Sequence, residues 1–138
     1  MPIRCEIVSQ DNVVFQDDVD IVVLPGIDGT MGILPEHSPV LTVLKFGIIS
    51  VRSGKTEQFF TVAGGIAEVQ PDQVTVLADA AENVEEIDIR RAEDARLKAE
   101  QRLSEGTIQD DETYLAIQAA LQRSNLRLSA VRRYKNRK

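Results

Sequence analysis

Up to about residue 80, apolar and polar residues alternate along the chain with a period of two, and β-branched residues are frequent. This alternation is typical of strands that bury one face of a sheet. Turn-forming residues at 10–12, 53–55 and 71–73 separate the apolar segments at short intervals. We predict an antiparallel β-sandwich or barrel of about ten short strands, whose apolar faces pack against each other. The alternation marks strands directly at residues 3–9, 13–16, 19–24, 40–44, 47–52, 57–62, 66–70 and 73–78.

Near residue 85 helical spacing replaces the alternation. Asp88 is a good helix N-cap, and no Gly or Pro interrupts the chain from there to the polar segment 104–107. Asp110 and Asp111 offer a second cap, from which a helix is predicted to run to about Val131. A connection this short favours an antiparallel helical hairpin. We expect two domains, a β-sandwich over residues 1–85 and a helical hairpin over residues 86–138.

The first predicted helix has a face of small residues, because Ala92, Ala95, Ala99 and Leu103 are spaced three or four apart. At ~25 cal/mol per Å² of buried apolar area, an Ala-lined contact stabilises far less than a Leu-lined one. The helices themselves have good propensity. We therefore expect helices that form readily but dock weakly, as in an element that detaches and re-docks, although a static appendage would have the same composition.

The chain has a net charge of −6, and its charged residues are distributed unevenly along the sequence. Residues 1–89 carry 4 Lys or Arg and 15 Asp or Glu, a net charge of −11, whereas residues 90–138 carry 12 and 7, a net charge of +5. An acidic body with a basic tail indicates two surfaces that meet different partners. Helices also carry more Lys and Arg in general, so both interpretations stay open. Aromatic residues make up only 4% and Trp is absent, which argues against nucleic-acid stacking.

Several kinds of chemistry are excluded by residue type. The single His and the single Cys rule out multi-histidine and thiolate metal sites, and Cys5 has no intramolecular disulfide partner. No nucleophile motif or phosphate-binding loop occurs, and Gly64 and Gly65 favour a bulge or tight turn. No apolar run reaches the ~18 residues of a membrane span, and no signal peptide is evident. We predict a non-catalytic protein in a reducing compartment, without metal and without membrane insertion.

One distinctive stretch is GTMGILPEHSPV, residues 29–40. Gly29 and Gly32 permit a close approach of backbone to another surface, and the two prolines stiffen the following chain. His37 is either a turn histidine bonded to nearby backbone or part of a rigid rim that docks on a partner.

Three segments of the chain resemble the epsilon subunit of F-type ATP synthase, of the bacterial and chloroplast type. They are residues 29–40, residues 60–79 (FTVAGGIAEVQPDQVTVLAD) and residues 85–103 (EEIDIRRAEDARLKAEQRL). The mitochondrial counterpart is called delta. The resemblance covers essentially the whole chain in order. It implies a non-catalytic subunit of the rotary central stalk in a proton-translocating synthase, peripheral to the cytoplasmic side of a bacterial plasma membrane.

The resemblance also implies partners. In that family the sandwich packs against the gamma subunit and the polar loops of the c-ring, and the hairpin can extend along gamma and inhibit ATP hydrolysis. We expect the basic hairpin to meet acidic surface on the catalytic beta subunits. Where the family often has an acidic residue, this chain has Thr30, so no ionic contact is expected there. The matching partner-binding segment comprises Thr30, Met31, Gly32, Ile33, Leu34 and His37.

A further motif implies ATP as a regulatory ligand, with no other cofactor required. Residues 87–92, IDIRRA, match the [IL]DxxRA pattern of epsilon subunits that bind ATP in the folded hairpin. In this hypothesis Arg91, Arg123 and Arg127 hold the triphosphate, because guanidinium groups bond phosphate oxygens strongly. The remaining members are Glu82 and Asp88 at the adenine end, Ile87 and Ala92 as walls, and Lys98 in place of another arginine.

Two alternatives remain open for these residues. Asp88 is also an adequate N-cap, and helical arginines usually lie in water. The chain is alternatively a free-standing nucleotide-binding β-sandwich module that acts outside any synthase.

Overall fold

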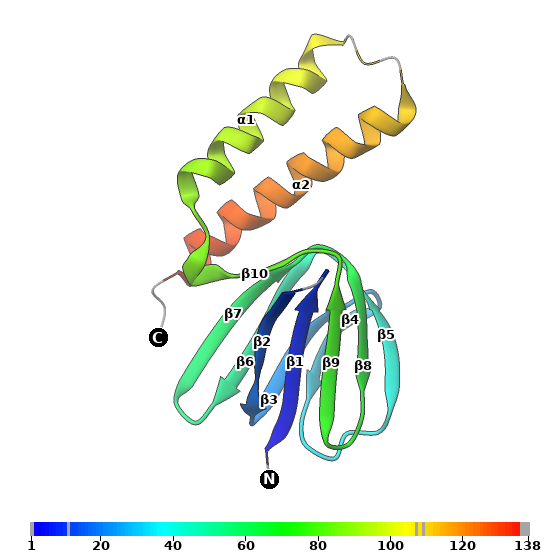
Figure 1. The fold of residues 1–138 in the computed structure, drawn as a ribbon, viewed down its shortest axis with the longest axis vertical. Helices are drawn as coiled ribbons and strands as arrows, with labels where there is room; N and C mark the ends of the chain where they lie inside the picture. The colour runs from blue at the N-terminus through cyan, green and yellow to red at the C-terminus, as the bar shows by residue number, and fades with distance from the viewer. Residues whose placement is uncertain (1, 11, 107, 109, 136–138) are drawn as a thin grey trace.

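The computed structural model describes residues 2–10, 12–106, 108 and 110–135. A β-sandwich of ten strands carries two helices at one end (Figure 1). The strands are β1 (Ile3–Ser9), β2 (Asn12–Val19), β3 (Ile21–Gly26), β4 (Gly29–Ile33), β5 (Val40–Leu44), β6 (Gly47–Ser53), β7 (Thr56–Val62), β8 (Gly65–Val69), β9 (Gln73–Ala78) and β10 (Ala81–Asn83). A 3₁₀ turn, Val84–Glu86, leads to α1 (Ile89–Glu105) and α2 (Asp111–Tyr134).

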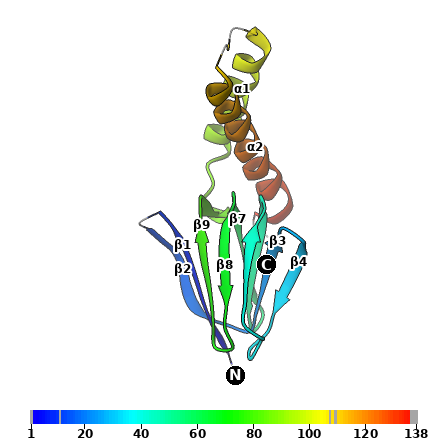
Figure 2. The same ribbon diagram turned by 90° about the vertical axis from the view of Figure 1, so that its right-hand side faces the viewer.

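The strands form two layers that face each other (Figure 2). One layer has the order β10-β7-β6-β3, with β4 paired to β3, and the other has the order β5-β8-β9-β1-β2. The layers join where Gly26 of β3 pairs with Leu44 of β5. The predicted sandwich and helical hairpin are confirmed. The pairing of β1 with β9 is parallel, however, which is possible because no hairpin turn joins these two strands.

The alternation did not locate two of the ten strands. Residues 29–33 form β4, whose two glycines hide the alternation, and β10 is too short to show a period. Gly64 precedes β8 and Gly65 is the first residue of β8, where the backbones of β8 and β9 approach closely. Gly65 has φ +131°, and a Cβ atom there would lie 2.8 Å from the Cα atom of Ala78 on β9. This position therefore requires glycine.

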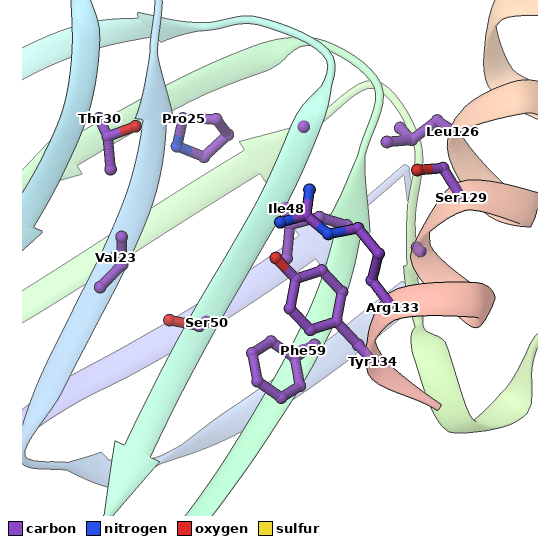
Figure 3. A pocket seen from close by; sticks show the side chains of 12 residues that line it. Val23, Pro25, Thr30, Ile48, Ser50, Phe59, Leu126, Ser129, Arg133 and Tyr134 are labelled. Carbon is purple, nitrogen blue, oxygen red and sulfur yellow. The ribbon is translucent and has the colours of Figure 1, made fainter. Parts of the chain in front are cut away.

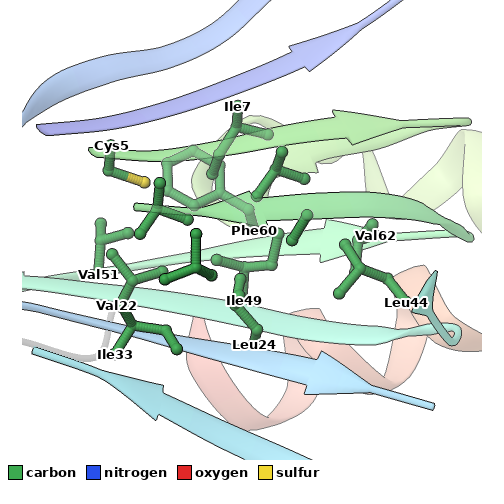
Figure 4. Packing of buried hydrophobic residues seen from close by; sticks show 14 of the residues in the cluster. Cys5, Ile7, Val22, Leu24, Ile33, Leu44, Ile49, Val51, Phe60 and Val62 are labelled. Carbon is green, nitrogen blue, oxygen red and sulfur yellow. The ribbon is translucent and has the colours of Figure 1, made fainter. Parts of the chain in front are cut away.

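The core lies between the two layers and is mostly aliphatic (Figure 4). Phe60 of β7 is fully buried, and its ring lies 5.2 Å from that of Phe15 of β2. Cys5 is fully buried in the same cluster. Burial, and secondarily the charge of Glu6, raises the pKa of the Cys5 thiol to about 12.

Both helices begin at the predicted caps. Asp88 Oδ1 accepts a hydrogen bond from the backbone N–H of Arg91, and Asp110 caps α2. The Thr113 hydroxyl, followed by the Glu112 backbone N–H, holds the pKa of the Asp110 carboxyl below its usual value. Gly106 ends α1 in the left-handed conformation, with φ +67°.

The small-residue face of α1 packs along α2, so it forms the inner seam of the hairpin. Ala92 and Ala99 are buried there, as are Ile117 and Ser124 of α2. The small-residue face of α1 therefore lines the contact between the two helices. Helical spacing identifies the apolar face of a helix, but it does not identify which neighbour covers that face.

The hairpin docks on the sandwich through a second buried cluster, here called the docking cluster. Tyr134, in the last turn of α2, stacks on Phe59 of β7 with 4.3 Å between ring centroids and 22° between ring planes. Lys135 Nζ donates a hydrogen bond of 3.1 Å to the backbone oxygen of Ile87. The docking cluster comprises Phe59, Val84, Ile87 and Ala130, with Ile48, Val131 and Tyr134 packed against them.

Candidate functional site

A groove with a volume of about 410 Å³ lies between the hairpin and the sandwich. Its walls come from β10, the turn between β1 and β2, the seam of the hairpin, and α2. It brings together three residues of the predicted ATP site, Glu82, Arg123 and Arg127. Guanidinium groups are suited to bind anionic oxygens, and the groove also carries the carboxylates of Glu82 and Asp79.

Glu82 and Arg127 form a two-pronged ion pair. Arg127 Nε lies 2.6 Å from Glu82 Oε1, and Arg127 Nη2 donates to Glu82 Oε2 at 3.1 Å. The side chains are 25% exposed for Arg127 and 40% exposed for Glu82. Nε is buried, and its N–H has no directed hydrogen-bond acceptor among the described residues despite the short distance to Oε1. Arg127 is thus neutralised by Glu82 but not fully hydrogen-bonded.

The other predicted ATP-site residues lie outside this groove. Asp88 and Arg91 are exposed in the first turn of α1, where the Asp88 carboxylate acts as the N-cap. Ile87 is buried in the docking cluster and Ala92 is buried in the α1 helix. Lys98 lines a neighbouring pocket of about 620 Å³, which meets the groove because Ala95 and Ala120 line both.

The predicted partner segment is divided between the two ends of the sandwich. Thr30 lies in the wall of a pocket of about 400 Å³ beside the docking cluster, opposite Arg133 and Tyr134 of α2 (Figure 3). Met31 and Gly32 continue along β4, and Ile33 is fully buried in the core. The burial of Ile33 removes it from any partner surface in this structure.

The rest of the segment forms a turn at the end of the sandwich opposite the hairpin (Figure 1). The Glu36 backbone N–H donates to Pro71 O at 2.7 Å, which ties this turn to the turn between β8 and β9. Leu34 is 57% exposed at its tip. The His37 ring Nδ1 lies 2.7 Å from Ser38 O, as in a turn histidine bonded to nearby backbone.

The outer face of the second layer carries an apolar row that sequence reasoning missed. Val43, Ile66, Leu77, Val8 and Val13 lie in cross-strand register over β5, β8, β9, β1 and β2. Val43 is 50% exposed, Ile66 40%, Leu77 50% and Val13 61%, while Val8 is half-buried. The sequence did contain an indication of this row. In segments such as VLTVL at 40–44, apolar residues occupy both faces of the strand, so one apolar face points away from the core.

The fold and these surfaces define a class, a β-sandwich with a C-terminal helical hairpin and an exposed apolar sheet face. Two family models match the chain in order. One, described as ATP synthase, Delta/Epsilon chain, beta-sandwich domain, covers residues 2–84, and the other, described as the long alpha-helix domain of the same chain, covers residues 85–132. The chain belongs to the ATP synthase delta/epsilon chain family.

Curated relatives agree with this assignment. The ATP synthase epsilon chain of Herpetosiphon aurantiacus is 42% identical over 137 residues, 99% of each chain. That of Syntrophobacter fumaroxidans is 48% identical over 126 residues, 91% of this chain and 92% of the relative. The predicted resemblance to the epsilon subunit is confirmed.

Solved structures share the fold at low identity. A chain of the Euglena gracilis mitochondrial ATP synthase has a TM-score of 0.76 at 23% identity, over 94% of this chain and 81% of that one. A chain of the Tetrahymena thermophila mitochondrial ATP synthase, from its central stalk and c-ring, has a TM-score of 0.59 at 14% identity, over 94% and 96%. In the described part of the chain, neither helix has the length and apolar character that crossing a bilayer requires.

Proposed function

We propose that the chain is a non-catalytic subunit of the central stalk of a proton-translocating F-type ATP synthase, peripheral to the cytoplasmic side of a bacterial plasma membrane. The sandwich attaches to the rotor and the hairpin regulates ATP hydrolysis. One observation carries this proposal. The sandwich has a broad apolar face pointing away from the hairpin contact, whereas the described residues of the hairpin rest on the sandwich through the docking cluster and the ion pair of Arg127 with Glu82.

The apolar row is the attachment surface for the gamma subunit. It lies across five paired strands, so its side chains are held at fixed spacing and need no ordering on binding. Exposed apolar rows on a sheet mark docking surfaces, and at ~25 cal/mol per Å² their burial favours association. The turn that contains Leu34 lies at the far end of the sandwich from the hairpin, which suits contact with the polar loops of the c-ring.

The hairpin is a brake on hydrolysis. Residues 90–138 carry a net charge of +5, opposite in sign to the −11 of residues 1–89, which suits an acidic surface on the catalytic beta subunits. The helices are capped within the hairpin itself, so they keep their structure when the docking cluster opens. This attraction should weaken as salt increases.

ATP favours the docked hairpin in this proposal. The groove is built from both domains, with Glu82 on β10 and both Arg123 and Arg127 on α2. A ligand that touches both domains binds the docked form better than the extended form and shifts the population toward it. Contact with Asp88 or Arg91 requires the first turn of α1 to rearrange, because these side chains lie outside the groove.

Two variants test the proposal in the assembled complex. A chain that ends after Asp88 keeps Val84 and Ile87 of the docking cluster, and we expect it to bind gamma but not to inhibit hydrolysis. Leu77→Glu places a charge in the apolar row, and we expect gamma binding to weaken by tenfold or more. Gln70→Glu adds the same charge at an exposed position outside the row and serves as the matched control. If the truncated chain inhibits as fully as the intact one, the brake lies elsewhere.

The free-standing nucleotide-binding module predicts a different result, since it has no partner in the synthase. Co-purification of tagged chain with gamma distinguishes the two. Family membership favours the stalk subunit.

A further inference from the structure

The ion pair between Glu82 and Arg127 joins the two domains across the groove. In the described part of the chain, it is the ion pair that links the hairpin to the sandwich. Both side chains are partly shielded from water, and the carboxylate meets the guanidinium through two atom pairs. Two-pronged pairs of this kind are stronger than single-contact pairs at the surface.

The same arginine lines the groove, and its side chain is 25% exposed, whereas Arg123 on the preceding turn of α2 is exposed. The Arg127 Nε atom is buried, yet the N–H does not point at the Glu82 oxygen. An incoming oxygen aligned with this N–H would make the hydrogen bond that Glu82 does not make. The Glu82 carboxylate therefore occupies the position that a phosphate oxygen would take, but it does not accept the hydrogen bond that the Arg127 Nε–H offers there.

We propose that Glu82 is a built-in competitor for the phosphate-binding arginine, an inference that rests on the proposed role of the groove as a nucleotide site. Without ligand, the Glu82 carboxylate neutralises Arg127 and clips α2 to β10. A phosphate group of a nucleoside triphosphate displaces the carboxylate, and the bound nucleotide then connects α2 to the sandwich in its place. This role differs from the predicted one, in which Glu82 holds the adenine end.

The competition gives Glu82 two effects of opposite sign. Removing its charge frees Arg127 for phosphate and so tightens nucleotide binding. It also removes the clip and so loosens the nucleotide-free hairpin. The docking cluster still holds α2 in such a variant, so most molecules remain docked and little affinity is lost to undocking.

Calorimetric titration of the full chain with ATP tests the first effect. For Glu82→Gln we expect the dissociation constant to fall about two- to fivefold, the range of partly exposed ion pairs. Asp79→Asn removes the same charge from another wall of the groove without freeing Arg127, and we expect a smaller change. Adding Glu82→Gln to Arg127→Ala should have no effect, because the competition needs the arginine.

Tyrosine fluorescence tests the second effect without nucleotide. The chain has two Tyr and no Trp, so in a Tyr114→Phe background the emission comes from Tyr134 in the docking cluster. Acrylamide should quench this emission more strongly in Glu82→Gln than in Asp79→Asn.

Three results would overturn the inference. Weaker ATP binding by Glu82→Gln would mean that Glu82 contacts the ligand. Equal changes in the ATP dissociation constant for Glu82→Gln and Asp79→Asn would mean that only the net charge of the groove matters, and not the pairing of Glu82 with Arg127. If no variant binds ATP, the competition and nucleotide sensing both fail, and the quenching result then shows only whether the pair clips the hairpin.

Discussion

The stack of Tyr134 on Phe59 predicts that one side chain controls hairpin docking. Tyr134→Ala deletes a ring that lies 4.3 Å from its partner ring and belongs to the only docking contact built from aromatic groups among the described residues. Tyr134→Phe keeps the ring and serves as the conservative control. Tyr114→Ala removes an exposed tyrosine elsewhere on α2 and serves as the matched control.

The magnitude follows from burial. Deleting a fully buried aromatic side chain costs about 3–5 kcal/mol, and a stacked pair contributes about 0.5–1.5 kcal/mol beyond its buried area. Tyr134 is half-buried, so we expect about 2 kcal/mol to be lost from docking. A loss of this size lowers the ratio of docked to undocked hairpin about 30-fold.

Amide hydrogen exchange of Ile87 and its neighbours is a suitable assay, because these amides lie beneath the end of α2. Tyr134→Ala should speed their exchange about 30-fold at unchanged helix content, whereas Tyr134→Phe and Tyr114→Ala should exchange like the wild type. Equal exchange in Tyr134→Ala and Tyr114→Ala would refute the reasoning, since docking would then not depend on the stack.

Three further predictions concern the sandwich and the caps. Because its pKa is about 12, Cys5 should resist maleimide in the native protein at pH 7 and react once the chain is unfolded. Because the pKa of Asp110 is lowered, its charged carboxylate stabilises α2 at pH values above the ordinary carboxyl pKa, and this stabilisation is lost as the pH falls through the lowered pKa. Amide exchange at Glu112 should therefore become faster in acid, and Asp110→Asn should reduce this dependence on pH. Gly65→Ala should lower the free energy of unfolding by about 2 kcal/mol or more, measured by urea denaturation, because the added Cβ meets the backbone of β9.

Local patterns in the sequence predicted most of the elements. The caps Asp88 and Asp110 marked both helices, because an N-cap is set by residues within one turn of it. The period-two alternation marked the long strands. It failed at β4 and β10, where glycines or short length leave no period to read. Parallel pairing of β1 with β9 is set by the whole topology, so no local signal announces it.

The candidate site was predicted less completely, because it depends on distant residues. Glu82 and Arg127 are far apart in sequence, and their pairing follows from where α2 crosses β10. A motif placed Ile87 in the site, but the structure uses this residue to seat the hairpin. The apolar row was missed because outward-facing apolar residues look like core residues until strand register is known.

The central claim is that the sandwich stays on the rotor while the hairpin undocks from the sandwich to inhibit hydrolysis. Linking the two domains tests this claim. Cysteines placed at Glu82 and Arg127, whose side chains touch, can be joined by a short bismaleimide while buried Cys5 stays unreactive. In the assembled synthase, we predict that the linked chain leaves ATP hydrolysis uninhibited and that the unlinked double variant inhibits it. Equal inhibition by the linked and unlinked chains would contradict the account.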